Sequence, residues 1–381
     1  MMTDIIPFNK PFVTGNEISF LNDAIALQHF SGDGFYTKEC QKLIEKFTSN
    51  KFNLLTNSCT AALEMTGLLA EIKPGDEVIL PSFTFSSTAN AFVLRGAIPV
   101  FVDICPDTLN IDEVYLEEAI SNKTVAIVPV HYAGVSCEMD QIMELAEDKS
   151  IFVIEDAAQG FLSSYKGKAL GTIGHFGCLS FHETKNIIAG EGGALLVNNK
   201  DFNLKAEMIR EKGTDRSQFF RGEVDKYNWK TVGSSYLPSE ITSAFLFSQL
   251  ENAQFITEKR REIWQYYFDE LGILEHEGLL KRPVIPQTCA HNAHIFYVVL
   301  RSDIDRNFVL DALRRSGVHA TFHYMPLHTS PAGIAYGRAV GRMENTFFVS
   351  EKILRLPLWV GITKAQQSKV IECLSGCLKS L

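Results

Sequence analysis

The amino-acid sequence predicts an α/β protein with a mostly parallel central sheet flanked by helices, followed by a smaller C-terminal α/β domain. Short apolar runs alternate with amphipathic runs from residue 52 to residue 158. This alternation is typical of strand–helix units, which build parallel sheets. The length of 381 residues exceeds one ordinary core and favours two domains. We therefore expect a large domain over residues 1–250 and a smaller one over residues 251–381.

The elements of the large domain are expected in a regular order. Helical periodicity first predicts two helices, at 14–29 and 37–49. The strand–helix pairs that follow are 52–58 with 60–72, 76–82 with 88–96, 98–104 with 112–120, and 124–132 with 140–149, and residues 151–158 form a last strand. After residue 160 the alternation stops, because 177–182 and 193–199 read as strands with no long helix between them.

The rest of the chain reads as one long helix and a second α/β unit. The helix is expected over 238–270. The unit consists of a strand at 295–302, a helix at 306–316, a strand at 319–324 and a final helix near 364–380.

Charge and cysteine spacing exclude several classes of protein. The formal net charge is −9 and there is no basic stripe, which argues against a nucleic-acid partner. The eight cysteines are scattered without a Cys-x-x-Cys pair, so neither a structural zinc site nor a disulfide framework is expected. The N-terminus lacks a signal pattern, and no apolar run reaches the roughly 18 residues of a membrane span. We expect a cytoplasmic protein without membrane insertion.

Two residues at strand ends carry the main chemical signal. Asp156 ends an apolar run, where a carboxylate can pair with a protonated ring nitrogen. Lys185 follows another strand, 29 residues later, just before the glycine cluster at 190–193. Its amine could form a Schiff base and shuttle a proton. Taken alone, an aspartate at this place is more often an acidic strand cap, and a lysine is more often a surface residue.

Other polar and aromatic residues follow neighbouring strands. Ser58, Cys59 and Thr60 occupy a strand-to-helix junction, where free N–H groups and hydroxyls bind anions or simply cap the helix. Phe85 could stack on an aromatic ring or pack in the core. Ser180 could bind a phosphate, and Gln159 a ring hydroxyl. An anion cup, an aromatic ring, an acid and a lysine in this order match the needs of pyridoxal 5′-phosphate (PLP), whose pyridinium ring accepts carbanion electrons.

At these residues the chain also resembles the DegT/DnrJ/EryC1/StrS family of sugar-nucleotide aminotransferases. The matching stretches are PGDEVILPSFTF (74–85), VPVHYAG (128–134), VIEDAAQG (153–160), SFHETKN (180–186), GEGG (190–193), FHYMPLH (322–328) and LPLW (356–359). Some members are dehydratases with histidine at the position of Lys185, so the lysine favours transamination.

The resemblance implies a fold of PLP fold type I and a role for each cofactor residue. It implies PLP bound to Lys185, Asp156 at the pyridinium nitrogen, Gln159 near the ring hydroxyl and Phe85 against the ring, with Ser58, Thr60 and Ser180 near the phosphate. It further implies a homodimer in which the partner chain completes each active site. Many members donate an asparagine across the dimer where this chain has Ser235, so Ser234 or Ser235 would have to replace it with a shorter reach.

The resemblance also implies the substrates, which are L-glutamate and a nucleotide sugar. The stretches 211–227 and 233–237 resemble members that aminate C4 of a dTDP-4-keto-6-deoxyhexose. The configuration of the product, galacto or gluco, and the nucleotide base do not follow from the residues.

Candidate substrate contacts come from two segments. The first is expected to be a loop for much of its length, and its arginine forks suit a diphosphate or form a solvated surface; its residues are Arg210, Lys212, Arg216 and Arg221. The second carries His323, Tyr324 and His328, which could line a sugar pocket. His319 and His323 lack a third ligand, so no metal is expected.

Two other functions remain open from the residues. One is a PLP-binding regulator without turnover, which would normally carry a separate DNA-binding domain. The other is a nicotinamide-dependent oxidoreductase, although GDGFYT (32–37) lacks the third glycine of that fingerprint.

Overall fold

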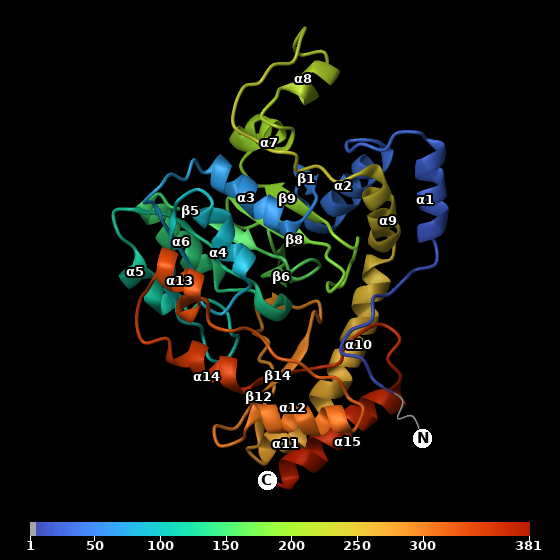
Figure 1. Ribbon diagram of the computed structural model, residues 1–381, viewed down its shortest axis with the longest axis vertical. Helices are drawn as coiled ribbons and strands as arrows, with labels where there is room; N and C mark the ends of the chain where they lie inside the picture. Colours follow the sequence, from blue (N-terminus) through green and yellow to red (C-terminus); the bar gives the residue numbers. More distant parts are fainter. Residues whose placement is uncertain (1–4) are drawn as a thin grey trace.

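The computed structural model describes residues 5–381 and is built around an eight-stranded sheet (Figure 1). The strands lie in the order β1 (Asn53–Thr56), β9 (Gly193–Val197), β8 (Phe176–Ser180), β5 (Phe152–Asp156), β4 (Thr124–Ile127), β2 (Glu77–Pro81), β3 (Ile98–Val102) and β13 (Arg338–Ala339). From β8 to β13 all neighbours are parallel, whereas β9 is antiparallel to both β1 and β8. The predicted mostly parallel sheet is confirmed.

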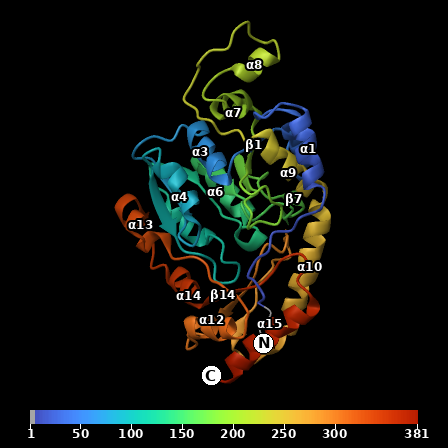
Figure 2. The same cartoon turned by 45° about the vertical axis from the view of Figure 1, so that its right-hand side comes forward.

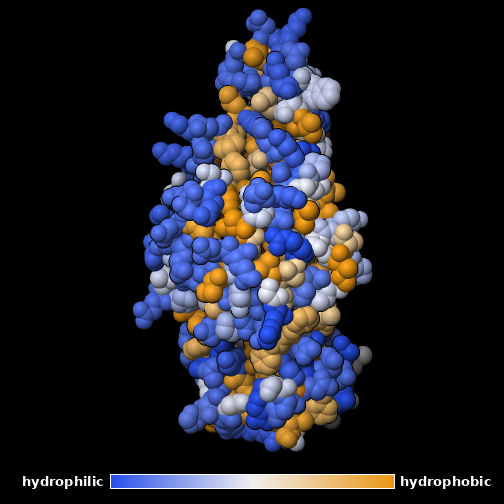
Figure 3. All heavy atoms as spheres, turned by 90° about the vertical axis from the view of Figure 1, so that its left-hand side faces the viewer, coloured by the Kyte–Doolittle hydropathy of each residue, from blue (hydrophilic) through white to orange (hydrophobic). Residues whose placement is uncertain are grey.

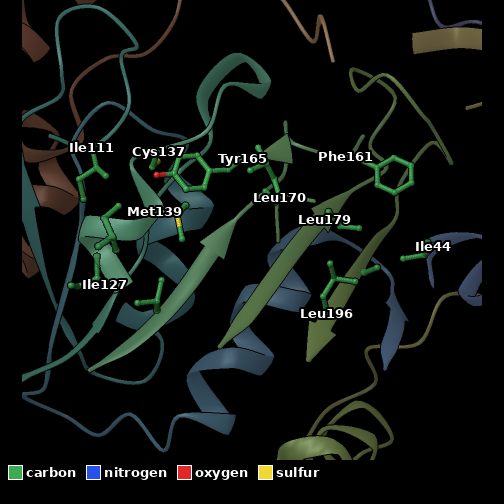
Figure 4. Close-up of a cluster of buried hydrophobic side chains, with 14 of the residues drawn as sticks. Ile44, Ile111, Ile127, Cys137, Met139, Phe161, Tyr165, Leu170, Leu179 and Leu196 are labelled. Atoms are coloured by element: carbon green, nitrogen blue, oxygen red, sulfur yellow. The ribbon is translucent and has the colours of Figure 1, made fainter. Parts of the chain in front are cut away.

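Both faces of the sheet are covered because successive residues of each strand point to opposite sides. Leu54, Val78 and Ile154 pack with α3 (Cys59–Leu69) and α4 (Ser86–Val93), which lie in front of the sheet in Figure 1. Their sequence neighbours, such as Leu55 and Val153, pack on the other face with α2 (Phe35–Thr48), α6 (Met139–Lys149) and α9 (Glu240–Glu251). Figure 4 shows part of this second layer. The near-continuous apolar runs of the sequence thus have one physical cause, burial on two sides.

Short elements complete the large sheet and its surroundings. They are α1 (Glu17–Ala26), α5 (Leu116–Ala119), β6 (Ser164–Tyr165), β7 (Lys168–Ala169), α7 (Asn203–Arg210), α8 (Arg216–Phe220), β11 (Cys289–Ala290), α13 (Pro331–Tyr336) and α14 (Glu344–Lys352). The strands β11, β6 and β7 form a small sheet of their own. In the segment expected to be mainly loop, Arg210 ends α7 and Arg216 begins α8.

The C-terminal part of the chain has an apolar cluster of its own. The sheet β10 (Leu280–Lys281), β12 (Phe296–Leu300) and β14 (Ile353–Leu356) packs with α11 (Gly272–His276), α12 (Arg306–Arg315) and α15 (Lys364–Lys379). Helix α10 (Ala253–Glu270) runs from the large sheet to these helices (Figure 2). Residue 250 as a domain boundary stays a prediction. No helix among the described residues is long and apolar enough to cross a membrane.

Two predicted elements differ from the structure. The helix expected over 238–270 is two helices, α9 and α10, which meet at Asn252, whose backbone leaves the helical conformation at φ −101° and ψ 8°. The strand expected at 319–324 is absent apart from one bridge between Thr321 and Arg355. The rings of His323 and Tyr324 stack, with 4.0 Å between their centroids and an angle of 7° between their planes. Adjacent residues of a strand cannot stack in this way, because their side chains point to opposite faces.

Candidate active site

A cavity of about 500 Å³ lies at the carboxyl ends of β5 and β8, between the large sheet and the C-terminal part. This edge of an open α/β sheet is where ligands usually bind. The structure brings together most of the predicted site residues, since the cavity is lined by Lys185, Asp156, Gln159, Ser58, Cys59, Thr60, Phe85, Ser180, His323 and Tyr324.

Asp156 is held rigidly at the end of β5. Its side chain is only 5 % exposed. The hydroxyl of Thr88 donates to Oδ2 at 2.8 Å, and the backbone N–H of Ala158 donates to Oδ1 at 3.1 Å. Each oxygen thus has a donor, so the carboxyl group is oriented before any ligand arrives. Thr88 belongs to the first turn of α4 and was not predicted from the sequence. Its hydroxyl also contacts that of Thr84, which precedes the helix, and the short polar run Ser82–Thr88 was the available signal.

Lys185 sits in a tight loop between β8 and β9. The N–H of Lys185 donates to the carbonyl of His182, and the N–H of Phe181 donates to the carbonyl of Gly192. Burial of the amine lowers the pKa of Lys185, and the charge of Arg355 lowers it further, against the opposite effects of Cys59 and Asp156. A larger share of Lys185 is therefore uncharged at neutral pH than for a lysine in water.

The start of α3 has free donors suited to an anion, and we call it the cup. Ser58 caps the helix by accepting from the N–H of Ala61 at 3.0 Å, and its carbonyl accepts from the N–H of Ala62. The first N–H groups of a helix have no partner within it, which leaves those of Cys59 and Thr60 for a ligand. A Cβ at Gly193 would overlap the backbone of Ser58 and Cys59. The glycine is therefore what allows β9 to lie directly behind the cup.

Three further predicted residues surround the space between Asp156 and the cup. Phe85 is 61 % exposed and lines the cavity, whereas its neighbour Phe83 is 1 % exposed and belongs to the core. Gln159 accepts from the N–H of Ala133 at 2.7 Å and donates to the hydroxyl of Tyr324 at 3.1 Å. Ser180, the last residue of β8, is 7 % exposed.

The C-terminal part contributes side chains that were not predicted from the sequence. Arg355 of β14, Arg260 of α10 and His294 all line the cavity. Arg260 donates to the carbonyls of Ala293 and His294, and burial lowers its pKa to about 9. The available signal for Arg355 was a charged residue inside the apolar run 353–358.

The other predicted residues lie elsewhere in this chain. His328 is bound to Ser82, with 2.6 Å between its Nδ1 and the serine hydroxyl. Arg216 pairs with Glu211 at 3.0 Å, and Arg221 pairs with both Glu207 and Glu223. None of these residues lines the cavity.

Ser234 and Ser235 are likewise outside the cavity of their own chain. Both are exposed, and the carbonyl of Ser235 accepts from the side chain of Asn57, next to the cup. A contact of either hydroxyl with a partner chain stays a prediction.

Comparisons with known proteins identify the family of this chain. Residues 13–375 match the model of the DegT/DnrJ/EryC1/StrS aminotransferase family. An uncharacterized protein of Methanocaldococcus jannaschii is 34 % identical over 365 residues, which cover 94 % of each chain.

Solved structures of similar proteins superpose over nearly the whole chain. The aminotransferase TlmJ from Streptoalloteichus hindustanus matches with a TM-score of 0.90 and 26 % identity, over 99 % of each chain. The putative sugar aminotransferase Spr1654 from Streptococcus pneumoniae, in its PLP form, matches with a TM-score of 0.90 and 25 % identity, also over 99 % of each chain. From the match over its length, this chain belongs to the DegT/DnrJ/EryC1/StrS aminotransferase family.

Proposed function

We propose that this enzyme uses PLP to transfer an amino group from L-glutamate to C4 of a dTDP-4-keto-6-deoxyhexose, giving dTDP-4-amino-4,6-dideoxygalactose and 2-oxoglutarate. The observation that carries the PLP chemistry is the meeting of Lys185, Asp156 and the start of α3 in one cavity. The substrate rests on the resemblance of 211–227 and 233–237 to dTDP-4-amino-4,6-dideoxygalactose transaminase. We further propose that this product is a precursor of surface polysaccharides and that the reaction takes place in the cytoplasm.

The residues of the cavity fit this cofactor. The free N–H groups at the start of α3, with Ser58, Thr60 and Ser180, are donors for a phosphate. Asp156 supplies a fixed carboxylate for a protonated ring nitrogen, and Phe85 supplies an aromatic face. When bound, the cofactor supplies the electron sink that makes amino transfer possible.

The chain itself holds and moves the proton. The lowered pKa of Lys185 favours a neutral amine, which can take a proton from the carbon that bears the amino group and return it. Thr88 and the N–H of Ala158 hold both oxygens of Asp156, so this carboxylate would be oriented for a cofactor ring nitrogen before the cofactor binds. Lys185 therefore acts as acid and base in both half-reactions.

Two parts of the proposal concern the partner chain and the nucleotide. The enzyme acts as a homodimer, with Ser234 or Ser235 reaching the phosphate site of the partner. Arg216 and Arg221 bind the diphosphate, which requires exchange of their present carboxylate partners for substrate oxygens. The arginine fork suits a diphosphate better than a single lysine would.

The function is tested by supplying L-glutamate and dTDP-4-keto-6-deoxyglucose to the purified enzyme. Mass spectrometry and NMR of the product should show an axial amine at C4 and the galacto configuration. Lys185→Ala should lose turnover by many orders of magnitude and lose the visible absorbance of lysine-bound cofactor. An equatorial amine would instead indicate the gluco product. Cofactor binding without any turnover would favour a regulator.

A further inference from the structure

Arg355 lines the cavity and has N–H donors without hydrogen-bond partners among the described residues. It lies on β14, opposite Tyr297 of β12, and its guanidinium lies 4.6 Å from the centre of the Phe8 ring. Among residues 5–381 no carboxylate forms an ion pair with it, and its Nε has no hydrogen-bond partner. A guanidinium taken out of water without a counter-ion is unfavourable, so an anionic ligand at this place would be stabilised.

His323 fixes the direction of this guanidinium. Nη1 of Arg355 is bonded to Nε2 of His323, and Nδ1 of His323 is 3.0 Å from the hydroxyl of Tyr132. An arginine can only donate, so Nε2 must accept, and the ring proton must sit on Nδ1. Burial and the charge of Arg355 lower the pKa of His323, which keeps the ring neutral and able to accept. One edge of Arg355 is thereby used, while Nε and Nη2 have no hydrogen-bond partner among residues 5–381. Because Nε is buried, a ligand that bonds to both atoms requires the guanidinium to turn toward the cavity.

The other cations of the cavity are committed elsewhere. Lys185 is assigned to the chemical step, and Arg260 donates to two backbone carbonyls. Arg355 is therefore the arginine of the cavity that can offer a two-pronged contact to a carboxylate.

The substrates differ in where they carry negative charge. In glutamate the α-carboxylate is attached to the carbon that loses its amine, so it must lie next to the reacting atoms and Lys185. In a nucleotide sugar the diphosphate is attached to C1, on the far side of the ring from C4. A cation that lines the same cavity as Lys185 and acts on its charge matches the first position.

Building on the proposed function, we infer that Arg355 binds the α-carboxylate of the amino donor and that His323 positions Arg355 for this contact. His323 then serves the donor half-reaction instead of lining the sugar pocket. Tyr132 supports the same unit from the buried side, since its ring is 1 % exposed.

The test separates the two half-reactions in Arg355→Lys and Arg355→Gln. Binding of 2-oxoglutarate to the pyridoxamine form is measured by calorimetry, and the glutamate half-reaction is followed by the cofactor spectrum. We expect both to weaken by about 10- to 100-fold. The half-reaction of the pyridoxamine form with the keto sugar should change by less than about threefold. His323→Gln keeps an acceptor for Nη1 and should be milder than His323→Leu in 2-oxoglutarate affinity.

Arg306→Lys is the matched control, because Arg306 also packs on an aromatic ring in the C-terminal part but does not line the cavity. It should leave both half-reactions unchanged. Weakening of the keto-sugar half-reaction alone, equal weakening of both, or unchanged 2-oxoglutarate affinity would each overturn the inference. A wild-type enzyme that binds PLP but is not converted by glutamate would contradict the proposed function itself, and this is measured before any variant.

Discussion

At the scale of single residues, Asp156 offers a change that alters charge without altering shape. An asparagine at this position can accept from Ala158 and donate to the hydroxyl of Thr88, which can turn toward Thr84. Asp156→Asn should therefore fold normally and keep much of its cofactor binding. It should lose well over tenfold in rate, more than about 1.4 kcal/mol, because the ring nitrogen loses its charged partner. Single-turnover rates with glutamate measure this, and a smaller loss would remove Asp156 from the role.

Lys185 predicts a pH dependence of stability in the cofactor-free protein. Its pKa is lowered in the folded state below the ordinary value of 10.5, by burial and by Arg355. Between the lowered pKa and 10.5 the unfolded chain binds the additional proton, so the free energy of unfolding rises with pH across this window. Lys185→Met should flatten that rise. Urea unfolding at several pH values compares the two proteins; parallel curves would show that the lysine is not desolvated.

Single residues also show what could be predicted from the sequence. Asp156 ends a strand that the apolar pattern locates, and Lys185 lies in the loop after another, so the sheet edge brings them together. Arg355 and Thr88 reach the cavity from other elements, and only their packing reveals it. Contacts between residues that are far apart in the sequence produce no periodic pattern of apolar residues, so they cannot be predicted from it.

At the scale of elements, the alternating pattern from residue 52 to 158 predicted the order of strands and helices, because each strand is buried on both faces. The error at 319–324 has a local cause. This segment matches a strand in composition, but the rings of His323 and Tyr324 stack on each other, and both line the cavity. The break at Asn252 was hidden because apolar residues continue from α9 into α10.

Because β9 and α3 are in close contact, we expect that Gly193 cannot be replaced by a larger residue without loss of stability. Gly193→Ala would push a methyl group into the backbone of Ser58 and Cys59. We expect the free energy of unfolding to fall by about 1–3 kcal/mol and PLP affinity to fall with it, since the cup moves. Gly376→Ala is the control, because nothing lies within 4 Å of its added Cβ in α15. It should raise the free energy of unfolding by about 0.5–1 kcal/mol. Chemical unfolding and PLP titration measure both variants, and unchanged PLP affinity in Gly193→Ala would show that the cup does not depend on this contact.

At the scale of the whole molecule, the cavity lies between the large sheet and the C-terminal part, which share a small apolar cluster that includes Tyr132 and Tyr297. Lys185 and Asp156 come from the large sheet, whereas Arg355 comes from β14 in the C-terminal cluster. A movement between these parts would therefore change the distance between Arg355 and the residues proposed to hold the cofactor.

The segment that carries α8 projects beyond α7, away from the sheet (Figure 1). Its side chains include exposed aromatic rings, with Phe220 71 % exposed and Trp229 79 % exposed. At this end of the molecule hydrophobic atoms lie among mostly hydrophilic ones (Figure 3). Phe220 and Tyr227 both contact the ring of Phe219, and an exposed aromatic cluster of this kind favours a protein–protein contact, which supports the proposed homodimer.

The last prediction concerns that dimer. If Ser234 or Ser235 binds the partner's phosphate site, PLP binds the dimer better than the monomer, and by mass action it must stabilise the dimer. Removing PLP should lower both the melting temperature and the dimer affinity measured by analytical ultracentrifugation. Ser234→Ala with Ser235→Ala should lower PLP affinity and reduce this dependence. Ser302→Ala, an exposed serine in the turn after β12, should change neither. A monomer that binds PLP fully and turns over substrate would rule out a shared site, because one chain would then supply every phosphate contact.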